Sequence, residues 1–329
     1  MKHPVSMMMT LALALTASIA GAADTPPPLT CSTVALKTQV LPGEWLILRH
    51  VLRNTTTSKV MVVGDDQWGF AFRLRSRAIG GEWRMSAFWP PEGIPSGDPP
   101  FASFQPGEEI QALHVMESSL SQAVGRYEVQ RVLRYSLWPD FTNPPAGAWA
   151  GAIECTPAQV EVVTPTGIDA EAFKALGPYP LSSDRWEILR SYPGSWYAGY
   201  VFLGTLGGGI DGSPYSMVWT RDNVRDGIRS GPAYVRPDLE YRAAKYHDQA
   251  VLLLAAVQTF LGAHPDFPLS SRLRLKQAGL LAYFERYEEA RALAKQALAE
   301  ADPAEDPIWK RDVQNFLDLL VEKGYLKPE

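Results

Sequence analysis

The sequence predicts a multidomain β + α protein, with an N-terminal antiparallel β-sandwich and a C-terminal α-helical region. In the first half, short β-branched and aromatic runs alternate with turn residues, as in two-sheet proteins. After Thr164-Pro165-Thr166 the apolar residues recur at helical spacing instead. Both cysteines, Cys31 and Cys155, lie in the first half, near its ends. We therefore expect a β domain over residues 31–165 and a helical domain over residues 166–329.

Residues 1–22 are predicted to be a cleaved signal peptide. A short basic region begins the chain, an apolar run extends from Met7 to Ile19, and Ala20-Gly21-Ala22 fits the small-residue cleavage pattern. The apolar run is short for a membrane span, so we expect no stable membrane insertion after cleavage. Residues 23–30 are predicted to be a proline-rich linker. The mature protein is expected to be periplasmic or secreted.

Composition narrows the classes of partner. The formal net charge is −5 and no long basic block is present, so nucleic acid is not an expected partner. An oxidising compartment favours pairing of Cys31 with Cys155, and a structural disulfide is the expected state. The alternative is two free thiols with a catalytic role.

The β domain is predicted from short runs bounded by Gly, Pro, Asn and Asp. The best strand candidates are Val34–Val40, Trp45–Arg53, Lys59–Val63, Phe70–Arg75, Glu82–Met85, Ile110–Val115, Tyr127–Leu137 and Gln159–Val163. Their number suits a two-sheet sandwich. The alternation is clearest from Tyr127 onward, which indicates a strand with one buried face.

Two tight turns repeat the tripeptide Pro-Gly-Glu, at Pro42-Gly43-Glu44 and Pro106-Gly107-Glu108. Proline sets the first turn angle, and glycine accepts the positive φ of a type II turn. Together with Gly125-Arg126-Tyr127-Glu128-Val129, this order of turns and strands resembles the Ig-like sandwich modules of secreted bacterial proteins. The resemblance covers about residues 32–163, and it implies a fold without implying a particular function.

The helical domain contains two clear tracts, Ala243–Leu261 and Arg272–Ala301, with prolines between and after them. A second, weaker copy of the later tract begins at Tyr246, and Trp309–Leu320 is predicted to form a final cap. The alternative is an irregular helical bundle that only mimics the spacing of a repeat. Two or three helix pairs are expected.

One segment resembles a known repeat. Tyr287-Glu288-Glu289-Ala290, followed by Ala294 and Ala297, resembles the second helix of a tetratricopeptide repeat, where small residues let helices approach closely. Gln277 departs from the leucine of that pattern, and Pro303 falls one residue late. The resemblance implies recognition of a protein or peptide along a concave helical face.

No residue pattern predicts catalysis. The five histidines have no zinc-site spacing, and no nucleophile elbow is present. The glycine-rich segment Gly207–Ser213 lacks the lysine of a P-loop and is interpreted as a loop. Aromatic residues between Trp186 and Phe202 are predicted to be buried between helices or domains. We therefore expect no enzymatic activity, no metal and no cofactor.

A second group of aromatic residues is a candidate contact surface. Trp83, Phe88, Trp89 and Phe101 bracket the proline-rich segment 90–95. If this loop is exposed, its rings would bind a partner. The alternative is that the rings fold back over the open end of the sandwich.

These patterns predict an exported, non-catalytic binding protein that acts on a protein or peptide in the bacterial envelope. Arg274 and Gln277, on the first helix of the repeat-like unit, are candidate partner contacts. One alternative is a proteinase inhibitor that presents the loop from Pro90 to Pro100. Another is glycan binding or hydrolysis, which needs a tryptophan platform and two carboxylates about 5 to 10 Å apart.

Overall fold

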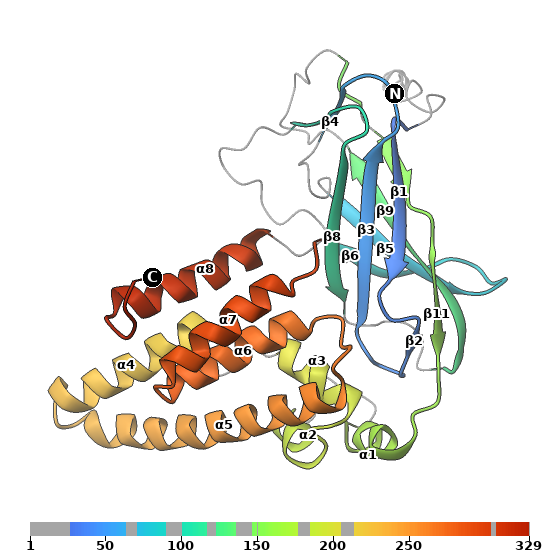
Figure 1. The fold of residues 1–329 in the computed structure, drawn as a ribbon. Coiled ribbons are helices and arrows are strands. Elements are labelled where there is room, and N and C mark those ends of the chain that lie inside the picture. Colours follow the sequence, from blue (N-terminus) through green and yellow to red (C-terminus); the bar gives the residue numbers. More distant parts are fainter. Residues whose placement is uncertain are drawn as a thin grey trace, which may run out of the picture.

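The computed structural model describes residues 27–63, 71–89, 101–116, 123–135, 147–149, 151–176, 185–204, 214–303 and 307–328. All strands among them precede all helices (Figure 1), so the chain has the β + α class expected from its sequence. The predicted signal peptide, the segment 90–100 and the glycine-rich segment lie outside the described residues.

The β half contains two main sheets. Its strands are β1 (Leu29–Ala35), β2 (Gln39–Val40), β3 (Leu46–Asn54), β4 (Val60–Val63), β5 (Ala71–Ala78), β6 (Arg84–Trp89), β7 (Phe101–Phe104), β8 (Glu109–Met116), β9 (Gly125–Tyr135), β10 (Gly151–Glu154) and β11 (Ala158–Val162). One sheet has the order β1-β3-β8, the other has the order β2-β11-β9-β5-β6 with β10 beside β9, and β4 pairs with β7. The β2–β11 pair is parallel, so the prediction of a wholly antiparallel sandwich is wrong at this edge.

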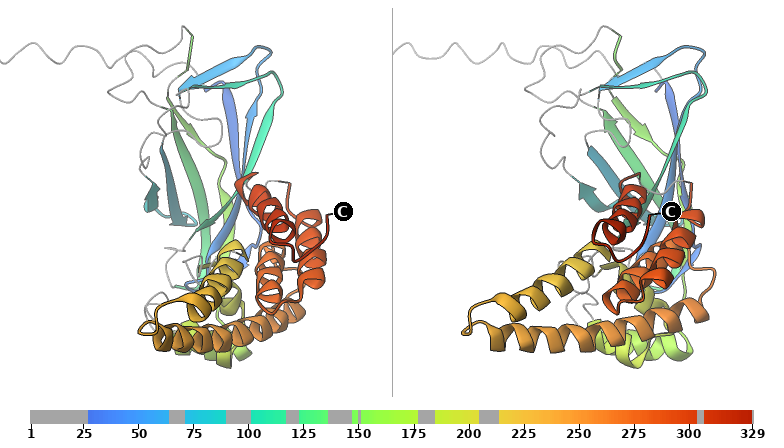
Figure 2. Two further views of the ribbon diagram at one scale, coloured as in Figure 1. Left: turned by 90° about the vertical axis from the view of Figure 1, so that its left-hand side faces the viewer. Right: turned by 60° about the vertical axis from the view of Figure 1, so that its left-hand side comes forward.

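The two main sheets pack face to face (Figures 1 and 2). Leu48 from the first sheet and Val129 and Val160 from the second belong to one buried apolar cluster. In β11 the side chains of Val160 and Val162 are buried, whereas the intervening Glu161 is half-buried. This alternating burial explains the alternation of apolar and polar residues in the sequence, because successive side chains of a strand point to opposite faces.

Several strand boundaries differ from the prediction. β1 begins at Leu29, inside the predicted linker, because this leucine is buried with only 1% of its surface exposed. The predicted strand Val34–Val40 is divided, since the chain leaves β3 after Ala35 and joins β11 at Gln39. β7 and β10 were not predicted. Each has four residues, too few for an alternating pattern to be diagnostic. β7 forms by pairing with β4, and β10 forms by pairing with β9.

A disulfide joins Cys31 to Cys155, as expected from the compartment. Cys31 lies in β1 of the first sheet, and Cys155 follows β10 of the second. Both side chains are buried in the apolar cluster that also contains Leu52 and Phe104. The bridge therefore links the two sheets across their shared core.

The helical half contains α1 (Gly167–Leu176), α2 (Arg185–Ser191), α3 (Trp196–Gly204), α4 (Pro214–Ser230), α5 (Arg236–Ala263), α6 (Ser270–Tyr283), α7 (Tyr287–Ala299) and α8 (Pro307–Glu322). The predicted tract Arg272–Ala301 is thus two helices, divided at Glu285, whose φ of 62° cannot continue a helix. Three alanines of α7, Ala290, Ala294 and Ala297, are fully buried in the cluster shared with α6 and α8. Figure 2 shows the helices gathered at one end of the sheets, with the α4–α5 hairpin extending away from them.

A buried polar cluster lies inside the β half. His50 and His114 pack edge to face, with ring centres 5.3 Å apart. The Thr33 hydroxyl lies 3.1 Å from Nδ1 of His50, and the guanidinium of the fully buried Arg131 lies 3.1 Å from Nε2 of His114. Burial, with the nearby charge of Arg131, lowers the pKa of His114 to about 3 and that of His50 well below its ordinary value. Both histidines are therefore neutral at pH 7.

The disulfide should make a large contribution to stability. The bond closes a loop with a sequence separation of 124 residues. Loss of such a constraint should lower the free energy of unfolding by on the order of 4 kcal/mol. Urea denaturation with and without dithiothreitol measures the difference. The Cys31→Ser/Cys155→Ser variant should match the reduced protein and show no response to the reductant, whereas equal midpoints for oxidised and reduced protein would contradict a stabilising bridge.

Acid should destabilise the β half through its neutral histidines. The pKa values of the two histidines are lower in the folded than in the unfolded chain. Their contribution to stability is therefore fully present above about pH 6.5, and it declines as the pH falls toward the pKa values of the folded state. Each histidine should remove up to about 1.4 kcal/mol per pH unit. Urea midpoints measured between pH 7 and pH 5 test this, and His114→Gln should reduce the dependence of the midpoint on pH. An unchanged pH dependence in that variant would contradict the assignment.

Candidate functional site

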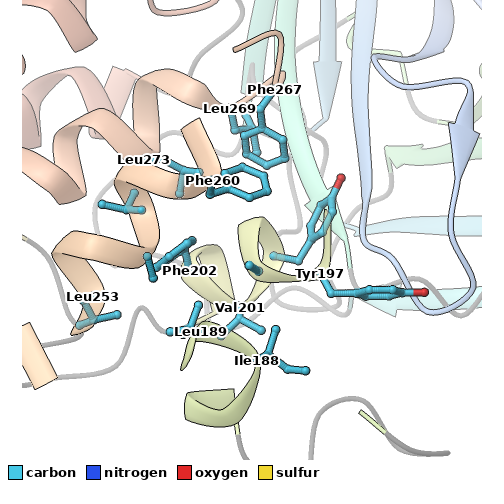
Figure 3. Packing of buried hydrophobic residues seen from close by; sticks show 14 of the residues in the cluster. Ile188, Leu189, Tyr197, Val201, Phe202, Leu253, Phe260, Phe267, Leu269 and Leu273 are labelled. Atoms are coloured by element: carbon cyan, nitrogen blue, oxygen red, sulfur yellow. The ribbon is translucent and has the colours of Figure 1, made fainter. Parts of the chain in front are cut away.

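The two halves meet at a shared apolar core around α3. Leu41, Ile47 and Leu113 of the β half belong to the same buried cluster as many residues of the helical half. On the helical side, Figure 3 shows side chains from α2, α3, α5 and α6 and from the α5–α6 connection converging, and the labelled ones include Ile188, Tyr197, Phe202, Phe260, Phe267 and Leu273. The prediction that the aromatic group between Trp186 and Phe202 forms buried core is confirmed. The halves are thus fixed to each other by packing as well as by the chain.

A buried carboxylate lies at this junction. Glu44 is only 1% exposed, and the ammonium of Lys37 donates to its two oxygens at 2.6 and 2.9 Å. The Tyr200 hydroxyl of α3 donates to Oε1 at 2.6 Å, and the Leu41 N–H donates to Oε2 at 2.6 Å. Burial raises the pKa of Glu44 and lowers that of Lys37, and their mutual attraction opposes both changes. The carboxylate therefore binds groups of both halves at once.

The first Pro-Gly-Glu turn places this carboxylate. Gly43 has a φ of 75°, and the Glu44 N–H donates to the Leu41 carbonyl at 3.0 Å, which is the geometry that the tripeptide predicts. The second turn repeats it, because Glu108 likewise donates to the Gln105 carbonyl and accepts from the Gln105 N–H at 2.6 Å. Glu108 is only half-buried, so the two turns differ mainly in what surrounds the carboxylate.

A cavity of about 620 Å³ lies beside the junction. Its lining includes Lys37, Gln39, Arg126, Glu161, Trp196 and Asp266, from both halves of the chain. The Lys37 ammonium lies 3.6 Å from the Trp196 ring centre, and the ring of His264 also packs against this tryptophan at 4.3 Å. Lys37 and His264 therefore already pack against the indole that lines this cavity.

A second cavity, of about 480 Å³, lies between α4 and α8. Its lining includes Pro214 and Tyr215 of α4 and Asp312, Asn315, Asp318 and Glu322 of α8. Tyr215 is 48% exposed, and Trp219, one turn later on the same face of α4, is 54% exposed. We call this surface the α4–α8 groove, defined by these residues. It combines exposed aromatic rings with carboxylates.

Buried polar contacts fix the walls of this groove. Arg221 of α4 is 4% exposed, donates to the Ala282 carbonyl at 2.6 Å, and forms an ion pair with Asp222 at 2.7 Å. The Tyr325 hydroxyl donates to Asp222 at 2.8 Å, and its ring stacks on Tyr287 with the centres 4.5 Å apart. These contacts join α4 to the end of α6, to α7 and to the segment after α8. They therefore fix α4, which forms one wall of the groove, against its neighbours.

Trp83, the first predicted contact residue, is half-buried in the β half. The guanidinium carbons of Arg75 and Arg77 lie 4.9 and 4.3 Å from its ring centre. These are cation–π contacts within the protein, so part of the ring is already covered.

The other predicted aromatic contacts are placed only by their backbone. The strand predicted to end at Met85 continues to Trp89, so Phe88 and Trp89 belong to β6, and Phe101 begins β7. Their side chains and the segment 90–100 lie outside the described residues. Partner binding at this loop stays a prediction.

The predicted contacts on the helices lie on α6. Arg274 forms an ion pair with Glu300 at 2.6 Å, and Gln277 is half-buried. Neither lines the α4–α8 groove. Sequence reasoning missed the groove, although Tyr215 and Trp219 carry a signal for it: two aromatic residues at i, i+4 spacing on a helix with a polar average composition.

The described residues contain no group of three or more His, Cys, Asp or Glu side chains arranged to hold a metal ion. In the same residues, no helix has the length and apolar character needed to cross a membrane.

Comparisons with known proteins give weak similarities only. No family model and no curated protein matches the sequence. Among solved structures, the sporulation control protein Spo0M from Bacillus subtilis is 13% identical over 45% of this chain and 53% of its own, with a TM-score of 0.26. The PapD-like domain 7 of human CEP192 is 11% identical (46% and 99% covered, TM-score 0.20). The native alpha-2-macroglobulin fragment from Escherichia coli is 13% identical (91% and 60% covered, TM-score 0.24). The chain thus spans about half the length of the first of these proteins, and similarity at this level assigns no activity.

The buried carboxylate predicts a sharp difference between the two Pro-Gly-Glu turns. Glu44→Gln should lower the free energy of unfolding by about 3 kcal/mol, because it removes the counter-charge of the partly buried Lys37 ammonium and one acceptor of a fully buried carboxylate. Glu108→Gln should cost about 1 kcal/mol or less, because this carboxylate makes the same backbone contact near solvent. Urea denaturation measures both variants, and adding Lys37→Met to Glu44→Gln should recover part of the loss. Equal losses for Glu44→Gln and Glu108→Gln would show that the junction does not depend on the carboxylate.

Proposed function

We propose that this protein is exported and acts as a non-catalytic binding protein, whose helical half recognises a segment of a partner protein in the bacterial envelope. The α4–α8 groove carries the proposal. It presents Tyr215 and Trp219, about half exposed, at and beside a cavity of about 480 Å³. Exposed aromatic side chains next to a preformed cavity are typical of protein-recognition surfaces.

The proposed architecture is an Ig-like sandwich followed by a tetratricopeptide-like helical array. Two facing sheets and a pair of Pro-Gly-Glu turns support the first assignment. The α6–α7 hairpin, which buries Ala290, Ala294 and Ala297, supports the second. In this proposal the β half serves as a rigid base, because the Glu44 carboxylate and the shared apolar core fix it to the helices.

Export is supported by two features. The first 22 residues have the pattern of a signal peptide, and Cys31 and Cys155 are paired. We propose the periplasm or the extracellular space as the site of action.

A cross-linking pull-down with the mature chain, residues 23–329, from envelope extract tests the proposal. Tyr215→Ala/Trp219→Ala should reduce recovery of specific partners roughly tenfold, because truncation of aromatic anchors removes most of the binding energy of an interface. The matched control is Tyr234→Ala/Tyr241→Ala, which removes two residues that are 84% and 68% exposed outside the groove. Circular dichroism should show that both variants remain folded. Equal recovery with the groove variant and the wild type would refute recognition through this groove.

A further inference from the structure

The described lining of the α4–α8 groove is acidic. Asp312, Asp318 and Glu322 line its cavity, and no lysine, arginine or histidine is found among the lining residues that the structure describes. Among the described residues, none of these three carboxylates takes part in an ion pair. In these residues, one side-chain hydrogen bond to the three carboxylates is found. Its donor is the neutral amide of Gln314, and its acceptor is Asp318, at 2.8 Å. The groove therefore attracts positive charge.

The neighbouring surface shows the opposite arrangement. Farther along α4, Asp222 is paired with Arg221 at 2.7 Å, and Asp226 with Arg229 at 3.0 Å. These residues line a separate cavity of about 280 Å³, or lie beside it, and their charges compensate each other. The excess of negative charge is thus local to the α4–α8 groove and does not simply follow from the net charge of the chain.

The shape and lining of the cavity favour an organic cation. Carboxylates beside an exposed aromatic face are a combination suited to a guanidinium or ammonium group, since the face of the ring also attracts cations. A volume of about 480 Å³ exceeds what one metal ion occupies, and the described residues form no cluster with metal-ligand geometry. Tyr215 supplies the ring, and Trp219 extends the apolar contact along α4.

We propose that the α4–α8 groove binds an arginine or lysine side chain within an exposed segment of the partner protein. This inference rests on the proposed function and specifies the chemistry that the groove recognises. The carboxylates of Asp312, Asp318 and Glu322 neutralise the cation, and Tyr215 packs against its alkyl stem or its charged end. The partner segment then continues along α4 over Trp219.

Arrays of degenerate heptapeptides test this proposal with the full mature chain. Each pool has random residues except at the central position, which is fixed as Arg, Lys, Gln or Glu. Pools with Arg or Lys should retain roughly tenfold more protein than pools with Glu, and the preference should decrease as salt rises. A signal that does not depend on the central residue, or a preference for Glu or Gln, would overturn the proposal.

Charge variants assign any preference to the groove. Asp312→Asn/Asp318→Asn/Glu322→Gln should abolish the preference for Arg and Lys. The control Glu171→Gln/Glu240→Gln/Asp248→Asn removes the same number of negative charges from exposed positions elsewhere on the helical half, and it should keep the preference. Loss in both variants would mean that net charge alone attracts the peptides, which would overturn the assignment.

The two proposals fail in distinguishable ways. If the arrays show no preference for a cation while Tyr215→Ala/Trp219→Ala still loses the partner, the groove binds a partner but not through a basic side chain. If partner recovery does not depend on Tyr215 and Trp219, the function proposed for the groove is wrong as well.

Discussion

The buried carboxylate of Glu44 is the constraint on which the arrangement of the two halves depends. A buried carboxylate is tolerated only when it is paired and hydrogen-bonded. Here Lys37 and a tight turn satisfy it from the β half, and Tyr200 satisfies it from α3. Because α3 also packs on α5 and α6, and α4 packs on both of these helices, the junction is connected to the α4 wall of the groove through α5 and α6. A purely apolar junction would fix the orientation of the two halves less specifically, because apolar contacts are not directional.

In the helical half, the charged residues between the helices are paired, whereas the carboxylates lining the α4–α8 groove form no ion pair with other described residues. Arg221 is buried and forms hydrogen bonds with the end of α6, with Asp222 and with Tyr287, so its charge serves the packing of the helices. In the part of the chain that the structure describes, Asp312, Asp318 and Glu322 form no ion pair, and Asp318 accepts one side-chain hydrogen bond, from Gln314. Natural surfaces generally intersperse both signs of charge, so the acidic lining beside exposed aromatic rings is the feature on which the proposed binding role rests.

Much of the architecture could be predicted from local sequence. The tripeptide at Pro42-Gly43-Glu44 predicts a type II turn because only glycine readily adopts the required positive φ. The small residues of α7, such as Ala294, predict close helix packing, and the observed burial agrees. By contrast, the division of the predicted strand between Ala35 and Gln39 and the short β7 were not predictable, because their pairing is decided by strands distant in the chain, and β10 is too short to show alternation.

The sequence by itself determined the compartment signals, the pairing of the two cysteines, the β + α order and the tight turns, because each depends on neighbouring residues or on composition. Only the tertiary structure decided which of two identical tripeptides holds a buried carboxylate and which remains near solvent. It also decided that Tyr215 lines the same cavity as Asp312 and Asp318, about a hundred residues away in the chain. Such contacts arise when packing brings distant helices together, and no local pattern encodes them.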